Sequence, residues 1–241
     1  EHFVIYRHDP HDSGTIGSDS IWDIHLDADD SLWIATDPGG LARFDAAADR
    51  FQRYVHNPYN QGSLRSNKVR TIFHDHMGDL WVGLFPSGVD YFDKSTALFT
   101  NYTAVPHDPD SLSHGGVLRF LPGRDGLLWI GTEGGLNAFN PSTGRFRRYL
   151  AEPRDAKALR VNAVLSLAAD PSGDLWVGTW AGGLHRFDPE RAEFTRFGPE
   201  DGVADAYIWS LLTDSHGRLW VGTENEGLQL YDREQQRFLQ Y

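Results

Sequence analysis

The stretch Leu175-Trp176-Val177-Gly178-Thr179 recurs along the chain. Close copies begin at Leu32, Leu80, Leu128 and Leu219, and successive tryptophans are 48, 48, 47 and 44 residues apart. Each copy is followed by a glycine and an apolar residue, and then by an aromatic residue next to Asp or Asn. Two more aromatic residues, three positions apart, close each repeat. A fixed period of this length is typical of repeat architectures, so the repeat decides the fold.

The pattern predicts four short strands in each repeat. In the second repeat the first strand is expected over residues 69–75, and a turn containing Asp and Gly, which tolerate tight-turn geometry, joins it to the Leu-Trp strand. The Leu-Trp strands are apolar at consecutive positions, as expected of strands buried on both faces. Gly or Ala two positions after each Trp is expected to let a side chain of a neighbouring sheet approach closely. No segment shows a helical apolar period, which predicts less than about 5% helix.

Sheets of four strands that are covered on both faces predict an all-β fold, a β-propeller of radial blades in a single domain. Separate sandwiches are excluded because one repeat buries too little core alone. The five units are expected at about residues 18–56, 66–104, 114–151, 161–198 and 205–241. Residues 3–6 repeat the spacing of a fourth strand, so a stray outer strand precedes the units. This count leaves two alternatives, a closed ring of five blades or, as the spare strand and the missing initiator Met favour, part of a larger propeller.

Composition excludes several classes of function. The net charge of −12, without long Lys/Arg runs, argues against a nucleic-acid partner. No apolar stretch reaches the ~20 residues that span a bilayer, so this segment is not expected to insert into a membrane. The absence of Cys excludes disulfides, thiolate metal sites and a Cys nucleophile. Because no phosphate-binding loop, nucleophile elbow or zinc motif occurs, we predict no catalytic residue, metal or cofactor.

Most polar motifs have a structural interpretation. The recurrent hairpin residues Asp27, Asp75, Asp170 and Asp214 are expected to accept hydrogen bonds from nearby backbone N–H groups and stabilise turns. The segment His74-Asp75-His76 is the nearest approach to a metal motif. The other units have unrelated residues at these positions, so a solvated turn is the preferred interpretation.

The candidate site consists of residues that differ between units on one face, where repeat folds tend to carry function. In a propeller, the connectors before first strands and the loops after second strands share this face. The variable residues there are Trp22, Asp23, Asp37, Arg70, Phe85, Glu133, Trp180, Tyr207, Trp209 and Glu224. Aromatic rings beside carboxylates and Arg suit sugars, which stack on rings and form hydrogen bonds. The predicted ligand-binding residues are Trp22, Arg70, Glu133, Trp180, Tyr207 and Trp209.

The tryptophans among these residues have two interpretations, as ligand-binding residues or as packing residues. Trp22 and Trp209 occupy equivalent positions in the first and last units. Their positions agree equally well with ligand binding and with simply filling the axial channel. Trp180 and Trp209 come from neighbouring units and are expected to lie close enough to frame one pocket. An open set of blades would also expose two apolar blade faces, which predicts self-association.

The units resemble the two-component regulator propeller repeat. Unit four carries the resemblance best, through Asn162, Val164, Leu167, Asp170, Gly173, the Leu175 to Thr179 run, Gly182-Gly183-Leu184 and Phe187-Asp188. The connectors His8-Asp9-Pro10, His56-Asn57-Pro58 and His107-Asp108-Pro109 are similar to those of the family too. Unit two departs at Leu84-Phe85-Pro86 and unit three at Gly115-Gly116, so a symmetric site built from all five units is not expected.

The resemblance implies a periplasmic sensing module of a bacterial inner-membrane protein whose output is a histidine kinase or a diguanylate cyclase. Such a module is expected to bind a small ligand, with an oligosaccharide as one candidate, or a partner protein domain, and not to be an enzyme itself. The alternatives are an enzyme on a propeller scaffold, either a lyase or a glycoside hydrolase, and a purely structural interaction platform, because fold does not determine function.

Overall fold

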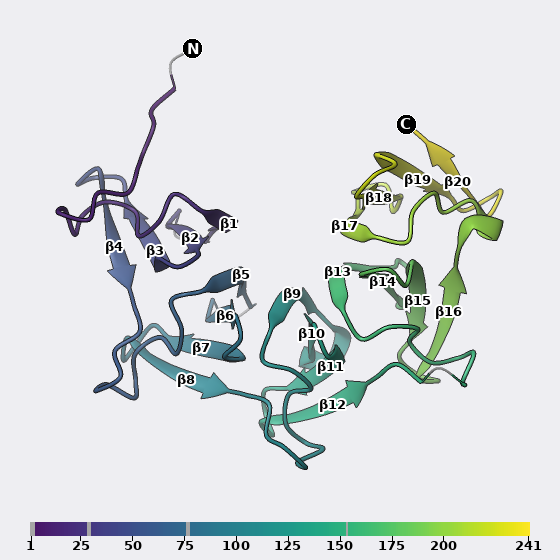
Figure 1. The fold of residues 1–241 in the computed structure, drawn as a ribbon, viewed down its shortest axis with the longest axis horizontal. Helices are drawn as coiled ribbons and strands as arrows, with labels where there is room; N and C mark the ends of the chain where they lie inside the picture. Colours follow the sequence, from purple (N-terminus) through teal and green to yellow (C-terminus); the bar gives the residue numbers. More distant parts are fainter. Residues whose placement is uncertain (1–2, 28–29, 76–77, 153) are drawn as a thin grey trace. The chain divides into compact units, whose positions relative to one another are not determined.

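The computed structural model describes residues 3–27, 30–75, 78–152 and 154–241. Within these residues the strands form five four-stranded antiparallel sheets, called blades 1 to 5, each with its strands in chain order (Figure 1). The chain divides into two compact units. Unit 1 is Glu1–Val105 with Gly115–Val117, and unit 2 is Pro106–His114 with Leu118–Tyr241. Unit 1 contains blades 1 and 2; unit 2 contains blades 4 and 5 and all of blade 3 except Val117.

The strand bounds are as follows. Blade 1 contains β1 (Ile21–Leu26), β2 (Leu32–Thr36), β3 (Gly40–Asp45) and β4 (Arg50–Tyr54), and blade 2 contains β5 (Val69–His74), β6 (Leu80–Leu84), β7 (Val89–Asp93) and β8 (Leu98–Tyr102). Blade 3 contains β9 (Val117–Pro122), β10 (Leu128–Thr132), β11 (Gly135–Asn140) and β12 (Arg145–Tyr149). Blade 4 contains β13 (Val164–Ala169), β14 (Leu175–Thr179), β15 (Leu184–Asp188) and β16 (Glu193–Phe197), and blade 5 contains β17 (Ile208–Thr213), β18 (Leu219–Thr223), β19 (Leu228–Asp232) and β20 (Arg237–Gln240).

Helix is confined, in the described part of the chain, to two single 3-10 turns. These are η1 (Arg124–Gly126) and η2 (Pro199–Asp201). The predicted all-β fold with almost no helix is therefore confirmed. No helix formed by the described residues is long and apolar enough to cross a lipid bilayer.

The Leu-Trp strands form the core between successive blades, as their apolar pattern predicts. All five residues of β14 are buried. The tryptophan of one blade packs on an aromatic residue of the third strand of the next blade. The ring pairs are Trp33–Phe92 at 5.8 Å, Trp129–Phe187 at 5.5 Å and Trp176–Tyr231 at 5.3 Å. The repeated aromatic residues therefore join neighbouring blades within each unit.

The glycine two positions after Trp permits this close packing. A β-carbon at Gly131 would lie 2.8 Å from the Val164 side chain, and one at Gly178 would lie 2.6 Å from the Ile208 side chain. Val164 and Ile208 begin the first strands of the following blades. The prediction that these glycines allow a neighbouring blade to approach is confirmed, because a larger side chain would collide there.

The first strands contain a bulge at their second residue. The pairing register shifts there in β1, β5, β13 and β17, which leaves Trp22, Arg70, Leu165 and Trp209 at equivalent unpaired positions. A bulge redirects the side chain that it carries. Three of the predicted site residues thus owe their orientation to the same irregularity.

The N-terminal segment keeps the aromatic spacing of a fourth strand but joins none of the five sheets. Tyr6 holds it against blade 1. The Tyr6 ring packs edge-on against Phe44 and Phe51, at 5.2 and 5.4 Å, and its hydroxyl donates a 2.6 Å hydrogen bond to Asp49. A fourth strand forms by backbone hydrogen bonding to the third strand of the same sheet. Residues 3–6 have no such third strand beside them among the described strands.

Candidate functional site

The loops after the second strands are fixed to the starts of the first strands in the same blade. Backbone hydrogen bonds run from Asp37 to Ser20 (3.1 Å), from Trp180 to Ala163 (3.0 Å) and from Glu224 to Tyr207 (3.2 Å). The loop residue of each blade is thereby positioned by backbone contacts and not by its own side chain. Its side chain is free to vary between repeats, as expected of a functional position.

Trp180, Tyr207 and Trp209 form one group in unit 2, here called the aromatic cluster. The Trp180 ring lies 4.9 Å from the Tyr207 ring and 5.5 Å from the Trp209 ring, at interplanar angles of 78° and 88°. Trp180 is 44% exposed and Trp209 is 46% exposed. Trp180 belongs to blade 4 and Trp209 to blade 5, and the expectation that these two tryptophans of neighbouring repeats meet agrees with this geometry. The two indole rings stand at right angles and remain half open to solvent.

Polar groups adjoin the aromatic cluster. The Asp205 carboxylate accepts a 3.1 Å hydrogen bond from the Tyr207 backbone N–H and another of 3.1 Å from the Asn225 side-chain amide. The backbone of Glu224, whose side chain is exposed, bonds to the Tyr207 carbonyl. Carboxylate and amide groups therefore stand beside rings that could stack on a ligand.

Trp22 and Arg70 meet in unit 1. The Arg70 guanidinium lies 3.6 Å from the centre of the Trp22 ring and 5.2 Å from that of Phe85, and it forms a 2.8 Å ion pair with Asp37. The Arg70 side chain is only 17% exposed. Trp22 itself is 51% exposed. The cation covers one face of the Trp22 ring and is neutralised by Asp37, so only the other face of this ring can stack on a ligand.

Glu133 and Asp23 make other contacts. The Glu133 carboxylate lies 3.7 Å from Nδ1 of His114, and both side chains are nearly half exposed. Within the described residues, no contact joins Glu133 to the aromatic cluster. Asp23 accepts hydrogen bonds from the Thr71 hydroxyl (3.0 Å) and the Ile72 backbone N–H (2.9 Å), which ties blade 1 to blade 2.

Comparison with known proteins supports the sequence resemblance. The sequence pattern of the family described as "Two component regulator propeller" matches residues 158–181 and 202–225. These two segments, which end in the loops after β14 and β18, match the repeat of that family. No curated protein sequence matches the chain.

Solved structures share the propeller fold. One is the extracellular domain of a putative hybrid two component system from B. thetaiotaomicron, with 23% identity and a TM-score of 0.80 over 91% of this chain. Another extracellular domain of such a putative system, from the same organism, has 26% identity and a TM-score of 0.75 over 98% of this chain. This chain spans 29% and 32% of the length of these two structures. Virginiamycin B lyase from Staphylococcus aureus is similar in fold, with 14% identity and a TM-score of 0.66, and the match covers 92% of this chain and 69% of the lyase.

In blades 2, 4 and 5 the hairpin Asp binds the repeated tryptophan. The indole N–H of Trp176 donates a 2.6 Å hydrogen bond to Asp170, and equivalent 3.0 Å bonds join Trp81 to Asp75 and Trp220 to Asp214. The predicted turn role is also present, since Asp170 accepts from the Ser172 backbone N–H at 2.9 Å. Sequence reasoning missed the indole contact, although the constant six-residue spacing between Asp and Trp was a visible signal.

Asp170 is strongly held as a carboxylate. Burial alone would raise its pKa, but hydrogen bonds from Arg233, Ser172 and Trp176 outweigh burial and lower the pKa to about 2. Asp170 is therefore ionised across the physiological range and acts as a structural acceptor.

The solvated-turn interpretation of His74 is wrong. The His74 side chain is 6% exposed, its Nε2 lies 3.2 Å from the Asp27 carboxylate, and its ring lies 4.6 Å from that of His25. The cause is the packing of β5 against β1, which brings the end of β5 onto the first hairpin of blade 1. His76 lies outside the described residues.

Proposed function

We propose that this chain is part of the extracytoplasmic, periplasmic sensing propeller of a bacterial membrane-bound signalling protein, and that its ligand binds on the aromatic cluster. Support for the sensing role comes from the matched family repeats and from the relative at 26% identity, which is an extracellular domain of a putative hybrid two component system. The observation that carries the binding proposal is the pair of half-exposed indole rings, Trp180 and Trp209, at right angles to each other.

The ligand class follows from the chemistry of the cluster. An apolar ring that is half open to water provides a stacking surface for the C–H face of a sugar, while Asp205, Asn225 and Glu224 supply acceptors and donors for hydroxyl groups. An oligosaccharide combines both features. A partner protein domain that inserts an apolar side chain between the rings is the second candidate occupant.

The enzyme alternative has weaker support. Similarity to the lyase is one of fold, at 14% identity. Acid–base chemistry would need a His and a carboxylate at the ligand, whereas the His114–Glu133 pair, 3.7 Å apart, makes no contact with the aromatic cluster among the described residues.

Calorimetric titration with a panel of oligosaccharides tests the proposal. Trp180→Ala and Trp209→Ala should each weaken binding by ~1–3 kcal/mol, as for other aromatic stacking platforms. Their thermal melts should stay near that of the wild type because both rings are half exposed. Tyr59→Ala is the matched control, since Tyr59 is 97% exposed and makes no ring contact with the cluster. If both Trp variants melt many degrees lower and no oligosaccharide binds the wild type, the rings are packing residues.

A further inference from the structure

A pocket in unit 2 lies between blades 3 and 4 and shares no residue with the aromatic cluster. Its volume is about 290 Å³, close to the lower end of small-molecule sites. Its lining includes Gly123 and Arg124 from the first hairpin of blade 3, Trp129 from β10, and Pro189 and Glu190 from the turn after β15.

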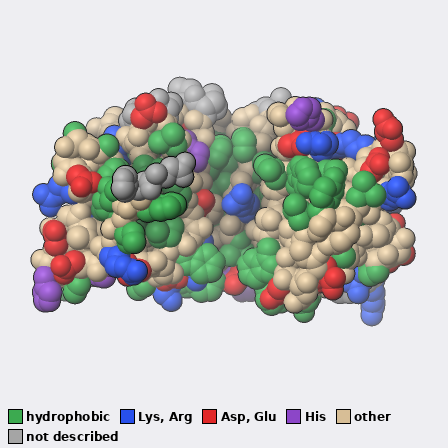
Figure 2. Space-filling view, turned by 90° about the horizontal axis from the view of Figure 1, so that it is seen from above, with side chains coloured by type: hydrophobic (Ala, Val, Ile, Leu, Met, Phe, Trp, Pro, Cys, Tyr) green, Lys and Arg blue, Asp and Glu red, His purple; other side chains and the backbone are tan. Residues whose placement is uncertain are grey.

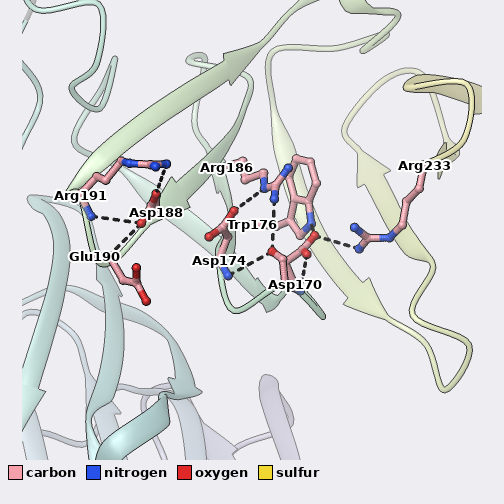
Figure 3. Close-up of polar contacts among 9 residues, drawn as sticks. Asp170, Asp174, Trp176, Arg186, Asp188, Glu190, Arg191 and Arg233 are labelled. Carbon is pink, nitrogen blue, oxygen red and sulfur yellow. Dashed lines mark hydrogen bonds and ion pairs between the residues drawn. The ribbon is translucent and has the colours of Figure 1, made fainter.

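An ion pair joins the blades at the equivalent place elsewhere in each unit. In unit 1, Lys94 of blade 2 binds Asp27 in the first hairpin of blade 1. In unit 2, the Arg233 guanidinium of blade 5 binds Asp170 in the first hairpin of blade 4 at 2.8 Å (Figure 3). In both pairs the cation directly follows the Asp that ends a third strand. A hairpin carboxylate and a cation from the next blade thus form a recurring contact.

Both members of this pair are missing between blades 3 and 4. The position six residues before Trp129 is Gly123, where blade 4 has Asp170 six residues before Trp176. The residue after Asp188 is Pro189, not Lys or Arg. Gly123 and Pro189 both line the pocket. The pocket therefore occupies the place where the chain lacks its own carboxylate and cation.

The missing carboxylate leaves an indole donor without a partner. Trp129 is 3% exposed, and its N–H forms no hydrogen bond with any described residue, whereas the Trp176 N–H is bound by Asp170. A β-carbon at Gly123 would lie 2.7 Å from the indole nitrogen of Trp129, so this nitrogen is aimed at the open position. Because Trp129 lines the pocket, a ligand bound there that supplies an acceptor can take the hydrogen bond that Asp170 takes from Trp176.

Most charged side chains that line the pocket form ion pairs, but Arg124 and Glu190 do not within the described residues. Asp170, Asp174 and Asp188 are paired with arginines, Asp174 with Arg186 at 2.6 Å and Asp188 with Arg191 at 3.1 Å. Arg124 and Glu190 form no ion pair within the described residues. In Figure 3 the Glu190 side chain points away from the Arg191 guanidinium. Among the described side chains, the pocket thus presents a cation from blade 3 and an anion from blade 4 that form no ion pair.

We propose that this pocket binds a small zwitterion that carries a carboxylate and an ammonium group, as a free amino acid does. The ligand carboxylate accepts the Trp129 indole N–H and faces Arg124, which replaces the missing hairpin Asp. The ligand ammonium faces Glu190, in place of the Lys or Arg that the turn after β15 lacks. The ligand thereby completes the blade contact that Asp27–Lys94 and Asp170–Arg233 make elsewhere.

Calorimetric titration of the full chain with glycine, L-alanine, acetate and methylammonium tests the zwitterion requirement. Glycine or alanine should bind at least ten times more tightly than acetate or methylammonium, because each single ion supplies only half of the pair. Equal affinities for acetate and the amino acids, or no binding of either amino acid, would overturn the proposal.

Three variants locate the site. Trp129→Phe keeps the ring but removes the N–H, and it should weaken glycine binding at least tenfold. Trp220→Phe is the matched control, because its N–H is bound by Asp214 outside the pocket, and it should bind glycine as the wild type does. Pro189→Lys restores the missing cation, so it should weaken glycine binding while acetate binds as well as before or better. Unchanged glycine binding by Trp129→Phe, or parallel loss of glycine and acetate binding in Pro189→Lys, would refute the site.

Discussion

The repeated tryptophans differ in how completely their surroundings cover them. Trp176 is fully buried between blades 4 and 5, where its ring contacts Phe197 and Tyr231 and its N–H binds Asp170. Trp220 occupies the same position in blade 5 but is only partly buried, with Tyr241 as its ring contact. The difference is that Tyr231 of the following blade covers the Trp176 ring, whereas the ring contact of Trp220 is Tyr241 of its own blade.

Trp176→Ala should therefore lower the free energy of unfolding by ~3–5 kcal/mol, the usual cost of truncating a large core aromatic residue. Trp220→Ala should cost distinctly less, since its ring is already partly solvated. Urea denaturation of both variants measures the difference. A midpoint for Trp176→Ala close to that of the wild type would contradict the packing between blades 4 and 5.

At the level of the strand, one buried position carries a different polar residue in successive blades. It is occupied by Asp90 in β7, Asn137 in β11, His185 in β15 and Gln229 in β19, all 0–2% exposed. Asp90 accepts a 2.7 Å hydrogen bond from the Arg65 backbone N–H, and Asn137 accepts one of 2.9 Å from that of Ser113. These contacts attach the connector between blades to the third strand. Neither ring nitrogen of His185 has a hydrogen-bond partner among the described residues.

Asp90 and His185 should make stability depend on pH in opposite directions. Burial raises the pKa of Asp90 from 3.8 to about 6, although the Arg65 N–H and Asn101 partly oppose it. Its contribution to stability is complete below its ordinary pKa and is lost as the pH rises through about 6. Burial, with the charges of Arg196 and Arg160, lowers the pKa of His185 from 6.5 to about 4. Its contribution is complete above 6.5 and is lost as the pH falls toward 4.

Replacing Asp90 or His185 with the amide residue found at that position in another blade tests the predicted direction of each pH dependence. Asp90→Asn introduces the residue type that Asn137 supplies in blade 3. It should raise stability at pH 7 by ~3 kcal/mol and have little effect at pH 3.5, since one pKa unit is worth about 1.4 kcal/mol. His185→Gln introduces the residue type that Gln229 supplies in blade 5, and it should reduce the loss of stability between pH 7 and pH 5. Urea denaturation midpoints measured between pH 3.5 and pH 7 would reveal both changes in stability. A pH profile identical to that of the wild type in both variants would contradict these assignments.

The sequence predicts strands better than it predicts contacts between blades. Strand order and the buried Leu-Trp strands follow from a periodic pattern, because every repeat must satisfy the same packing. The buried position of Asp90 and His185 escaped notice since its residue types share no pattern. The meeting of Trp180 and Trp209 was predictable because equivalent loop and bulge positions of neighbouring blades adjoin. The partner of His74 was not, because it depends on how the end of β5 packs against blade 1.

Across the whole molecule, two opposing forces act on contacts between copies of the chain. Apolar side chains remain exposed on β1 and on blade 5, namely Ile21, Ile24, Leu26, Leu212 and Leu228, each 41–61% exposed. Hydrophobic side chains also reach the surface in the view of Figure 2. The net charge of −12 keeps copies apart through repulsion that salt screens. We propose that a second copy of the chain covers the exposed side chains of β1, with salt deciding which force dominates.

Sedimentation velocity should accordingly show a concentration-dependent increase in mass that grows between low and physiological salt. Ile24→Lys combined with Leu26→Lys should suppress the increase at both salt concentrations, because it adds charge to an apolar strand without removing a core side chain. Val55→Lys is the matched control, since Val55 is 47% exposed but lies in the connector after β4, and it should leave the association unchanged. Association that weakens as salt is added would indicate attraction between charged groups. In that case β1 would not be the contact, because its exposed surface is apolar and gains nothing from the removal of salt.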